Sequence, residues 1–277
     1  MTTLHASIEG IGFWAPGLPT WDAARAFART GALADGAPAR PSPQVLAPNE
    51  RRRAPDTVAV ALDVAQAACT AAGRDASTLP SVFASTHGEL AITDFMCATL
   101  RDAPATVSPT RFHNSVHNAA AGYWTIGTGC MAPATAISAY DATFAQGLLE
   151  ALVQLACGSD AVLLVGYDGP ATGPLAGVTR STGVLGAALV LARGDTPGAL
   201  RITARLRDGV ADAAHGPLSA HAAGNAMAPM LALFDALARG DARVALGAGA
   251  GRVLELELIP AAASALAGLA QAEALDA

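Results

Sequence analysis

The sequence predicts an α/β fold, because a strand, a helix and a second strand follow one another between residues 135 and 166. The first strand, Thr135 to Ser138, is short and apolar enough to be buried. In the helix, Ala142 to Cys157, apolar residues recur at helical spacing, and Gly158 follows where a left-handed residue ends a helix. With 277 residues, 52% of them hydrophobic, the chain can bury a large core as one domain or as two fused halves.

Local patterns predict the remaining elements in order along the chain. We expect strands over 8–13, 81–85, 161–166, 183–191 and 199–206, and the last two are predicted to form a hairpin. We expect helices over 21–30, 58–72 and 90–101. Thr20 precedes the first of these helices, and Pro55 suits the first turn of the second. Proline and glycine over 36–48 predict a surface excursion, and the alanine-rich residues 261–277 predict a helix or a frayed end.

Composition excludes several classes of function. The net charge of −6 and the lack of a basic stripe argue against a nucleic-acid partner. The sequence contains no lysine, which excludes Schiff-base catalysis and a phosphate-loop lysine. The cysteines have no metal-binding spacing, so we expect no metal and a reduced, cytoplasmic chain. There is no signal peptide and no apolar run of membrane-spanning length, so we expect no membrane contact.

An acid occupies the turn between the strand at 135–138 and the helix that follows it. Such a turn directs backbone N–H groups and the positive end of a helix dipole at its occupant, and enzymes commonly place a thiol or hydroxyl nucleophile there. Here the occupant is Asp141, which cannot attack as a thiolate. Three roles are open for Asp141: capping the helix by accepting from the N–H of Thr143 or Phe144, acting as a base or nucleophile, and plugging a pocket or sensing a partner.

The segment from His117 to Asp168 resembles the nucleophile region of β-ketoacyl synthases of the thiolase-like superfamily. In that family an Asn-x-x-x-Gly segment leads through a Gly-Pro-Ser strand to the active cysteine. This chain shows Asn118 to Gly122, then Ala132-Pro133-Ala134 and then Asp141, without a gap. Weaker resemblances to the family's other strands and helices cover 8–16, 51–72, 180–193, 223–237 and 246–258.

The resemblance implies a thiolase-like fold, layered α-β-α-β-α, with a shortened C-terminal half. We therefore expect a thiolase-like N-terminal half over 1–195. A truncated C-terminal half, packed into the same domain, is expected over 196–260. A helical or frayed tail is expected over 261–277.

Three departures from the family pattern imply that this chain cannot condense acyl groups itself. A condensing enzyme of the family needs a cysteine and two histidines. Asp141 stands at the cysteine position, Asn225 stands at a histidine position after Gly224, and the His-Gly-Thr segment between the two halves has no counterpart. The pattern resembles short chain length factors, the catalytically silent partners of active synthases in type II polyketide and aryl polyene systems. Close relatives of these carry a Ser-Val-His-Asn segment, which this chain shows at Ser115 to Asn118.

The same resemblance implies a partner and an interface. We expect a heterodimer with an active β-ketoacyl synthase, a homodimer when the chain is alone, and no cofactor. The subunit would shape the partner's acyl tunnel in polyketide, aryl polyene or fatty-acid-like biosynthesis. In the family the strand before the nucleophile pairs antiparallel across a two-fold axis, and this strand supplies Thr135, Ile137 and Ser138. The bulky candidates for the tunnel wall are Phe112, Tyr123, Trp124 and Phe144.

An acyl carrier protein is a further candidate partner. The run from Arg51 to Arg53 is either a solvated helix start or a contact for such an acidic protein. His87 and Glu89 follow the strand at 81–85, where α/β folds bind ligands, or else they form a structural turn. His117 either holds the loop before the helix at Gly122 by hydrogen bonding or shuttles protons.

Two functions of other classes stay open at this point. The first is an acyltransferase or hydrolase of the thiolase fold that acts alone through His117, Asp141 or Cys130. Cys130 is a lone thiol in a glycine-rich loop, and nothing near it in the sequence clearly lowers its pKa. The second is a monomeric module that binds an acyl chain or a carrier protein in a closed apolar pocket.

Overall fold

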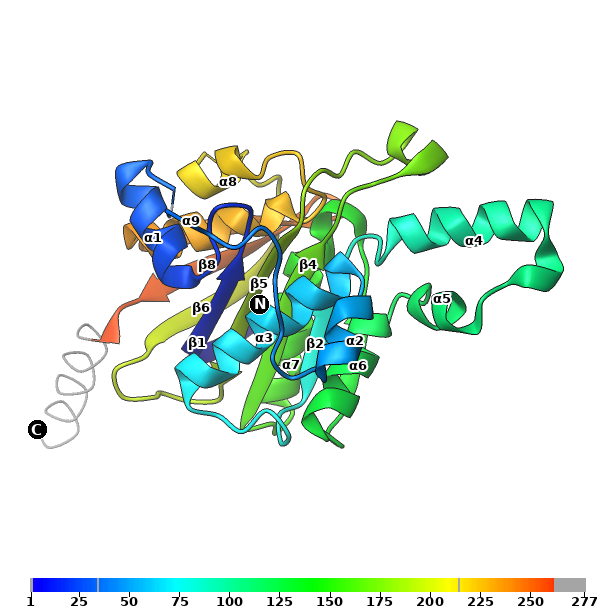
Figure 1. Ribbon diagram of the computed structural model, residues 1–277. Coiled ribbons are helices and arrows are strands. Elements are labelled where there is room, and N and C mark those ends of the chain that lie inside the picture. The colour runs from blue at the N-terminus through cyan, green and yellow to red at the C-terminus, as the bar shows by residue number, and fades with distance from the viewer. Residues whose placement is uncertain (1, 34, 214, 262–277) are drawn as a thin grey trace, which may run out of the picture.

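An eight-stranded sheet with helices on both of its faces organises the protein (Figure 1). The computed structural model describes residues 2–33, 35–213 and 215–261, so residues 262–277 of the predicted tail lie outside the described residues. The strand order is β3-β2-β4-β5-β1-β6-β8-β7, which confirms the α/β class. The strands are β1 (Thr3–Trp14), β2 (Ser81–Ala84), β3 (Ala134–Ile137), β4 (Ala161–Asp168), β5 (Leu185–Ala192), β6 (Leu200–Asp208), β7 (Arg243–Gly249) and β8 (Arg252–Ile259).

Local signals begin and end several of the helices. Thr20 caps the first one by accepting a hydrogen bond from the N–H of Ala23, and Gly31 ends it in the left-handed conformation. The α-helices of the described residues are α1 (Trp21–Thr30), α2 (Pro48–Arg53), α3 (Asp56–Ala72), α4 (Leu90–Asp102), α5 (Pro109–Asn114), α6 (Ala119–Thr128), α7 (Thr143–Ala156), α8 (Pro217–His221) and α9 (Leu231–Arg239). Short 3-10 turns are η1 (Pro104–Thr106), η2 (Tyr140–Ala142), η3 (Gly173–Gly177) and η4 (Ala228–Met230).

Alternate side chains of the central strands build two hydrophobic cores. Val82 of β2 and Leu164 of β4 belong to the core that contains α7 and α9. Phe83 and Leu163, their neighbours along the same strands, belong to the core that contains α3 and α6. Burial of one large apolar side chain is worth about 1.5–3 kcal/mol. The central strands are therefore covered on both faces, as buried parallel strands such as β2 and β4 require.

Helix α3 lies unusually close to β1, and two glycines make this approach possible. A Cβ atom added to Gly10 would lie 2.2 Å from the carbonyl oxygen of Ala68. One added to Gly12 would lie 2.0 Å from the carbonyl oxygen of Val64. Any side chain at either position would push the helix away from the sheet.

Strand β1 joins two parts of the sheet. Residues Thr3 to Ile8 pair antiparallel with β6, and Ser7 to Trp14 pair antiparallel with β5, where the register shifts between Ile8 and Gly10. Inward-facing residues of β6, β7 and β8 share one core with α7 and α9. The two helices therefore lie between the two parts of the sheet, which gives four layers in the order α-β-α-β.

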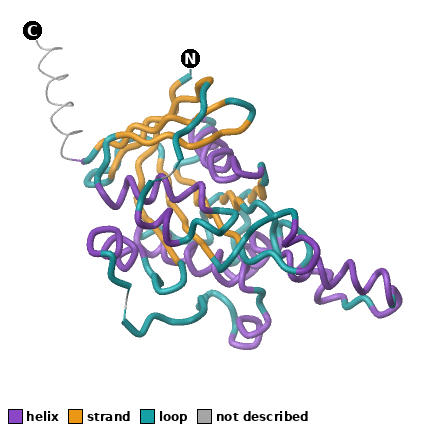
Figure 2. Tube along the Cα trace, turned by 90° about the horizontal axis from the view of Figure 1, so that it is seen from above, coloured by secondary structure: helices purple, strands orange, loops and turns teal. Residues whose placement is uncertain are grey.

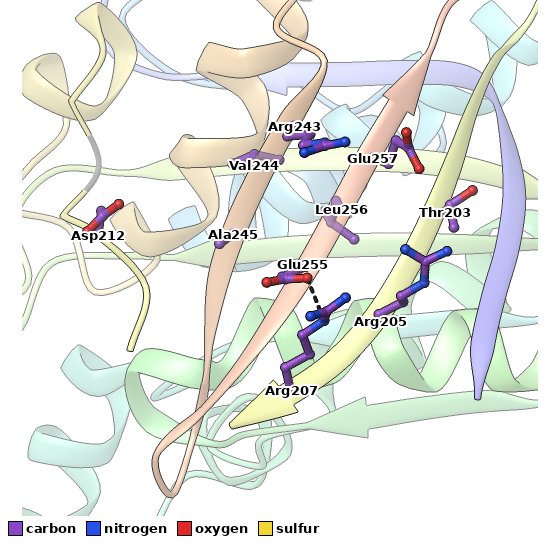
Figure 3. A pocket seen from close by; sticks show the side chains of 10 residues that line it. All are labelled: Thr203, Arg205, Arg207, Asp212, Arg243, Val244, Ala245, Glu255, Leu256 and Glu257. Carbon is purple, nitrogen blue, oxygen red and sulfur yellow. Dashed lines mark ion pairs between the residues drawn. The ribbon is translucent and has the colours of Figure 1, made fainter. Parts of the chain in front are cut away.

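The outer face of β6, β8 and β7 is polar. It carries Thr203, Arg205 and Arg207 on β6, Glu255 and Glu257 on β8, and Arg243 on β7, around a groove of about 460 Å³ (Figure 3). Glu255 and Arg207 form an ion pair of 2.7 Å. Seen from above, the strands near the N-terminus lie at one margin of the molecule (Figure 2). Within the described residues, the last helical layer of the predicted five is absent over this face.

Two strand predictions were wrong. Strands β5 and β6 do not form a hairpin, because β1 lies between them. The link between them passes the side of β1, where Ser7 donates to the carbonyl of Gly194 and accepts from the N–H of Thr196. The predicted strand at 135–138, before Asp141, is also not buried. It corresponds to β3, an edge strand whose residues are exposed or half-buried.

An arm made of α4, η1 and α5 projects from the body of the molecule (Figure 1). Only Leu90 and Met96 of α4 are buried. The arm packs largely on itself, with the guanidinium of Arg111 3.7 Å from the centre of the Phe95 ring. No helix of the described residues is long and apolar enough to cross a membrane.

Candidate functional site

The elbow between β3 and α7 has a strained backbone. Tyr140 adopts a φ of 52°, a left-handed conformation that costs a residue other than glycine about 1–3 kcal/mol. The buried Thr143 hydroxyl fixes this turn, since it donates to the carbonyl of Tyr140 at 2.6 Å and accepts from the N–H of Ala139 at 2.9 Å. The turn is thus locked at the end of an edge strand.

Asp141 does not cap α7, so the capping role predicted for it was wrong. The helix begins without a side-chain cap, and the preceding turn η2 has none either. The hydroxyl of Thr143 performs the local hydrogen bonding instead, and the side chain of Asp141 is exposed. Asp141 therefore offers its carboxylate to the surface rather than to the helix.

Asp141 lines an open cleft of about 610 Å³. The other polar side chains of this cleft are Arg180, Asp212, Ser219 and Asn225. Its remaining walls are small and apolar, mostly alanines from the segment before α9 and from β7. The cleft brings together positions 141 and 225, which the sequence resemblance predicts to correspond to a cysteine and a histidine of the family.

Asn225 uses its polar atoms to hold the surrounding backbone. Its Nδ2 group donates to the carbonyls of Asp168, Thr182 and Gly183, each at 3.2 Å. Its Oδ1 atom accepts from the N–H of Met227 at 2.9 Å. The residue is buried, so this amide joins three chain segments and has no free polar atom for proton transfer to a substrate.

A buried carboxylate organises the loop after β2. Asp168, the last residue of β4, accepts hydrogen bonds from the Ser85 hydroxyl at 2.7 Å, the Thr86 N–H at 2.9 Å and the His87 N–H at 3.2 Å. Burial raises the pKa of the Asp168 carboxyl above its usual range, and the hydrogen bonds from Ser85 and Thr86 oppose that shift. This loop is the one that carries His87 and Glu89.

The predicted polar residues of this region meet around that loop. The Nε2 atom of His117 is 2.7 Å from the carbonyl oxygen of Ser85, which assigns the proton to Nε2. His87 bonds through Nε2 to the Thr179 hydroxyl. Glu89 accepts from the Thr57 hydroxyl at 2.7 Å and caps α4 through the N–H of Ala91.

Asn118 stands apart from this group. Its side chain is exposed and makes no cap for α6, which begins directly after it. Cys130 is buried near the start of β2, where its thiol contacts the carbonyl oxygen of Leu79 at 3.5 Å. Because His117 contacts Ser85 at the opposite end of β2, these two residues cannot act as a nucleophile and its base.

The tunnel-wall candidates fall into two groups. Phe112, on α5, is exposed, and Tyr123, on α6, is half-buried. Trp124 and Phe144 are buried in the two cores of this chain, and their place in the tunnel wall stays a prediction. Both side chains lie on the inner face of their helix. The sequence alone did not show whether that face would meet the core or a partner.

Two residues of this region escaped prediction from the sequence. Asp168 follows a continuous apolar run, and an acid at the end of such a strand is the signal that identifies it. Tyr140 gave no local signal, because its left-handed backbone depends on the packing of the elbow. The described residues contain no group of three or more His, Cys, Asp or Glu side chains that could hold a metal ion.

A family model for the N-terminal domain of β-ketoacyl synthases matches residues 21–251 of this sequence. No curated protein matches the chain. The comparison with solved structures finds the thiolase-like ketosynthase fold repeatedly.

Three of these structures indicate the range of the similarity. A ketosynthase in complex with its chain length factor, from Xenorhabdus doucetiae, matches with a TM-score of 0.72 and 22% identity over 92% of this chain and 99% of the matched chain. The ishigamide ketosynthase/chain length factor matches with a TM-score of 0.68 and 15% identity, over 93% and 99%. A β-ketoacyl synthase from Burkholderia phymatum STM815 matches with a TM-score of 0.58 and 17% identity, over 86% and 72%.

Proposed function

Because this chain belongs to the β-ketoacyl synthase family, we propose that it is a chain length factor, a non-catalytic subunit that pairs with an active ketosynthase and shapes its acyl tunnel. The products would be polyketides, aryl polyenes or fatty-acid-like chains. The pair would work in the cytoplasm.

The elbow carries this proposal. A condensing enzyme of the family holds its acyl chain on a cysteine at the turn where this chain has Asp141. A carboxylate is a poor substitute for a thiolate as the carrier of an acyl chain, because its acyl product would be a mixed anhydride, which is less stable than a thioester. Asn225, at a family histidine position, holds backbone carbonyls instead of facing a substrate. The chain therefore lacks both a carrier for the acyl group and a group to assist decarboxylation.

The exposed edge of β3 supports the proposal that a partner subunit binds there. This strand pairs with β2 on one side only, so its other side presents free N–H and C=O groups within the described residues. Large apolar side chains lie near it: Ile126 is 76% exposed, Met131 94% and Tyr140 79%. An antiparallel strand of a synthase would complete the sheet and cover these side chains.

The projecting arm supports the proposal of the same interface. It leaves the body between β2 and β3 in sequence, and it presents the exposed side chains of Leu100 and Phe112. An arm that packs mainly on itself gains stability when a partner covers it. Phe112 is the one predicted tunnel-wall residue that the structure leaves both exposed and on this arm.

The length of the chain also fits a partner subunit. The chain covers 99% of the matched chains in both ketosynthase/chain length factor structures, but only 72% of the Burkholderia phymatum synthase. Contact with a carrier protein would use Arg53, since Arg51 is engaged with Gln44 and the carbonyl of Leu46, and Arg52 donates to the side chain of Asn49.

The first experiment tests the pairing. The chain is co-expressed with the cysteine-bearing β-ketoacyl synthase proposed as its partner and analysed by size-exclusion chromatography with light scattering. We expect one peak with the mass of a heterodimer. Two separate peaks at micromolar concentration would contradict the pairing.

The second experiment tests the absence of catalysis and separates the proposal from an acyltransferase that acts alone. The lone chain is incubated with an acyl thioester, and its intact mass is measured beside that of the synthase. We expect an acyl adduct on the synthase only. An adduct on the lone chain that disappears in Asp141→Ala would overturn the non-catalytic assignment.

A further inference from the structure

Tyr140 combines two properties that stability alone does not favour. Its backbone is left-handed, where glycine or asparagine is the favourable residue. Its side chain is large and partly apolar, yet it is 79% exposed. Strained backbone conformations of this kind concentrate at functional sites, because the surrounding structure must maintain them.

The surroundings hold Tyr140 in a defined position. The Thr143 hydroxyl fixes its carbonyl, and Thr143 is itself buried. On one side the tyrosine ring meets the ring of His87 edge to face, with centroids 6.4 Å apart. His87 is fixed in turn by the Thr179 hydroxyl and, through its N–H, by Asp168. The remaining surface of the tyrosine ring is free.

The position of Tyr140 in the fold indicates what its exposed ring would contact in a complex. Tyr140 follows Ile137, the last residue of β3, by three residues. A partner strand added along β3 would therefore end beside it. Ser138, between the two, donates to the carbonyl of Thr86 and joins this segment to the loop after β2. Tyr140 thus stands at the end of the seam that a partner would form.

We propose that Tyr140 crosses this seam and contacts the acyl chain growing in the partner synthase, so that its ring helps to set the length of the product. The proposal rests on the proposed function and assigns one specificity-determining residue to it. The ligand is an acyl chain that carries keto or olefinic groups. The ring gives it an apolar wall, and the phenol gives it one hydrogen-bonding group.

The test uses the complex with the synthase and compares the product distributions of four variants. Tyr140→Gly and Tyr140→Ala remove the wall, so we expect products longer by whole two-carbon units. Tyr140→Trp extends the wall, so we expect shorter products. Tyr140→Phe keeps the ring and should retain the length. Leu33→Ala, at a position 51% exposed beyond the end of α1, is the control and should change nothing.

A second readout distinguishes specificity from a structural role. The isolated Tyr140→Gly chain should melt at the same temperature as the wild type or higher, because glycine accepts the left-handed turn without strain. A photoreactive p-benzoylphenylalanine at position 140 should crosslink to the synthase, and the same group at position 33 should not.

The outcomes separate the two proposals. A wild-type chain that forms no heterodimer with the synthase contradicts the proposed function, and the role of Tyr140 with it. An intact heterodimer whose product length is the same in Tyr140→Gly, Tyr140→Trp and the wild type contradicts the role of Tyr140 alone.

Discussion

The hydroxyl of Ser85 donates a 2.7 Å hydrogen bond to the carboxylate of Asp168, and this contact joins the ends of two parallel strands, β2 and β4. Two backbone N–H groups of the following loop reach the same carboxylate. One buried acid thereby fixes the loop that positions His87, which in turn meets Tyr140. The geometry of the elbow thus depends on a residue in another strand.

Replacing Asp168 tests this dependence through pH. Burial raises the pKa of this carboxyl in the folded state, so its contribution to the free energy of unfolding is full below the unfolded pKa of about 4 and falls as the pH rises through the folded pKa. The difference in free energy of unfolding between wild type and Asp168→Asn should therefore shrink as the pH rises. Urea denaturation at several pH values measures it.

The control for this experiment is Asp75→Asn. Hydrogen bonds from Ser77 lower the pKa of the exposed Asp75 carboxyl, so the corresponding difference should grow as the pH rises. A difference for Asp168→Asn that follows the Asp75 trend would contradict the assignment of Asp168 as a carboxyl whose charged form is disfavoured by burial.

Removing the amide of Asn225 should destabilise the fold. In Asn225→Ala the carbonyls of Asp168, Thr182 and Gly183 lose a shared donor in a buried place, which typically costs about 1–3 kcal/mol. The exposed Asn118→Ala, whose side chain caps no helix, should change the free energy of unfolding by less than about 0.5 kcal/mol. Chemical denaturation of both variants measures this, and equal effects would refute the structural role of Asn225.

The free edge of β3 can be blocked without breaking the sheet. The carbonyl groups of Pro133 and Ile137 accept hydrogen bonds from the N–H groups of Ser81 and Ser85. Because successive residues of a strand direct their backbone groups to opposite sides, the N–H of Ala136 points to the unpaired side of β3. Ala136→Pro removes that N–H and should leave the melting temperature of the lone chain within a few degrees, since edge strands tolerate proline. It should abolish the heterodimer in size-exclusion chromatography, whereas Ala136→Thr should retain it. A heterodimer that survives the proline would place the interface elsewhere.

The lock on the elbow is tested at Thr143. Thr143→Val keeps the shape of the side chain but leaves the carbonyl of Tyr140 and the N–H of Ala139 without their partner, which should cost about 1–3 kcal/mol. Thr143→Ser keeps the hydroxyl and should cost less. Thermal unfolding of the two variants gives the comparison, and a valine variant as stable as the serine variant would show that the hydroxyl does not hold the turn.

Much of the fold could be predicted from sequence because its signals are local. Thr20 and Gly31 delimit α1, and the helical spacing after residue 142 with Gly158 beyond it delimits α7. The acid at position 141 was visible for the same reason: a strand that ends at a helix defines the turn between them. The division of the chain at residue 195 and the catalytic silence of the subunit remain predictions.

Local sequence patterns thus identified most of the elements and the acid at the turn before α7. Only the tertiary structure decided that β1 separates β5 from β6, that β3 is an exposed edge, and that Trp124 and Phe144 face the cores. It also decided that Thr143, and not Asp141, holds the elbow. The reason is physical: spacing and caps act over a few residues, but strand order, burial and the partner of a hydroxyl depend on segments far apart in the chain.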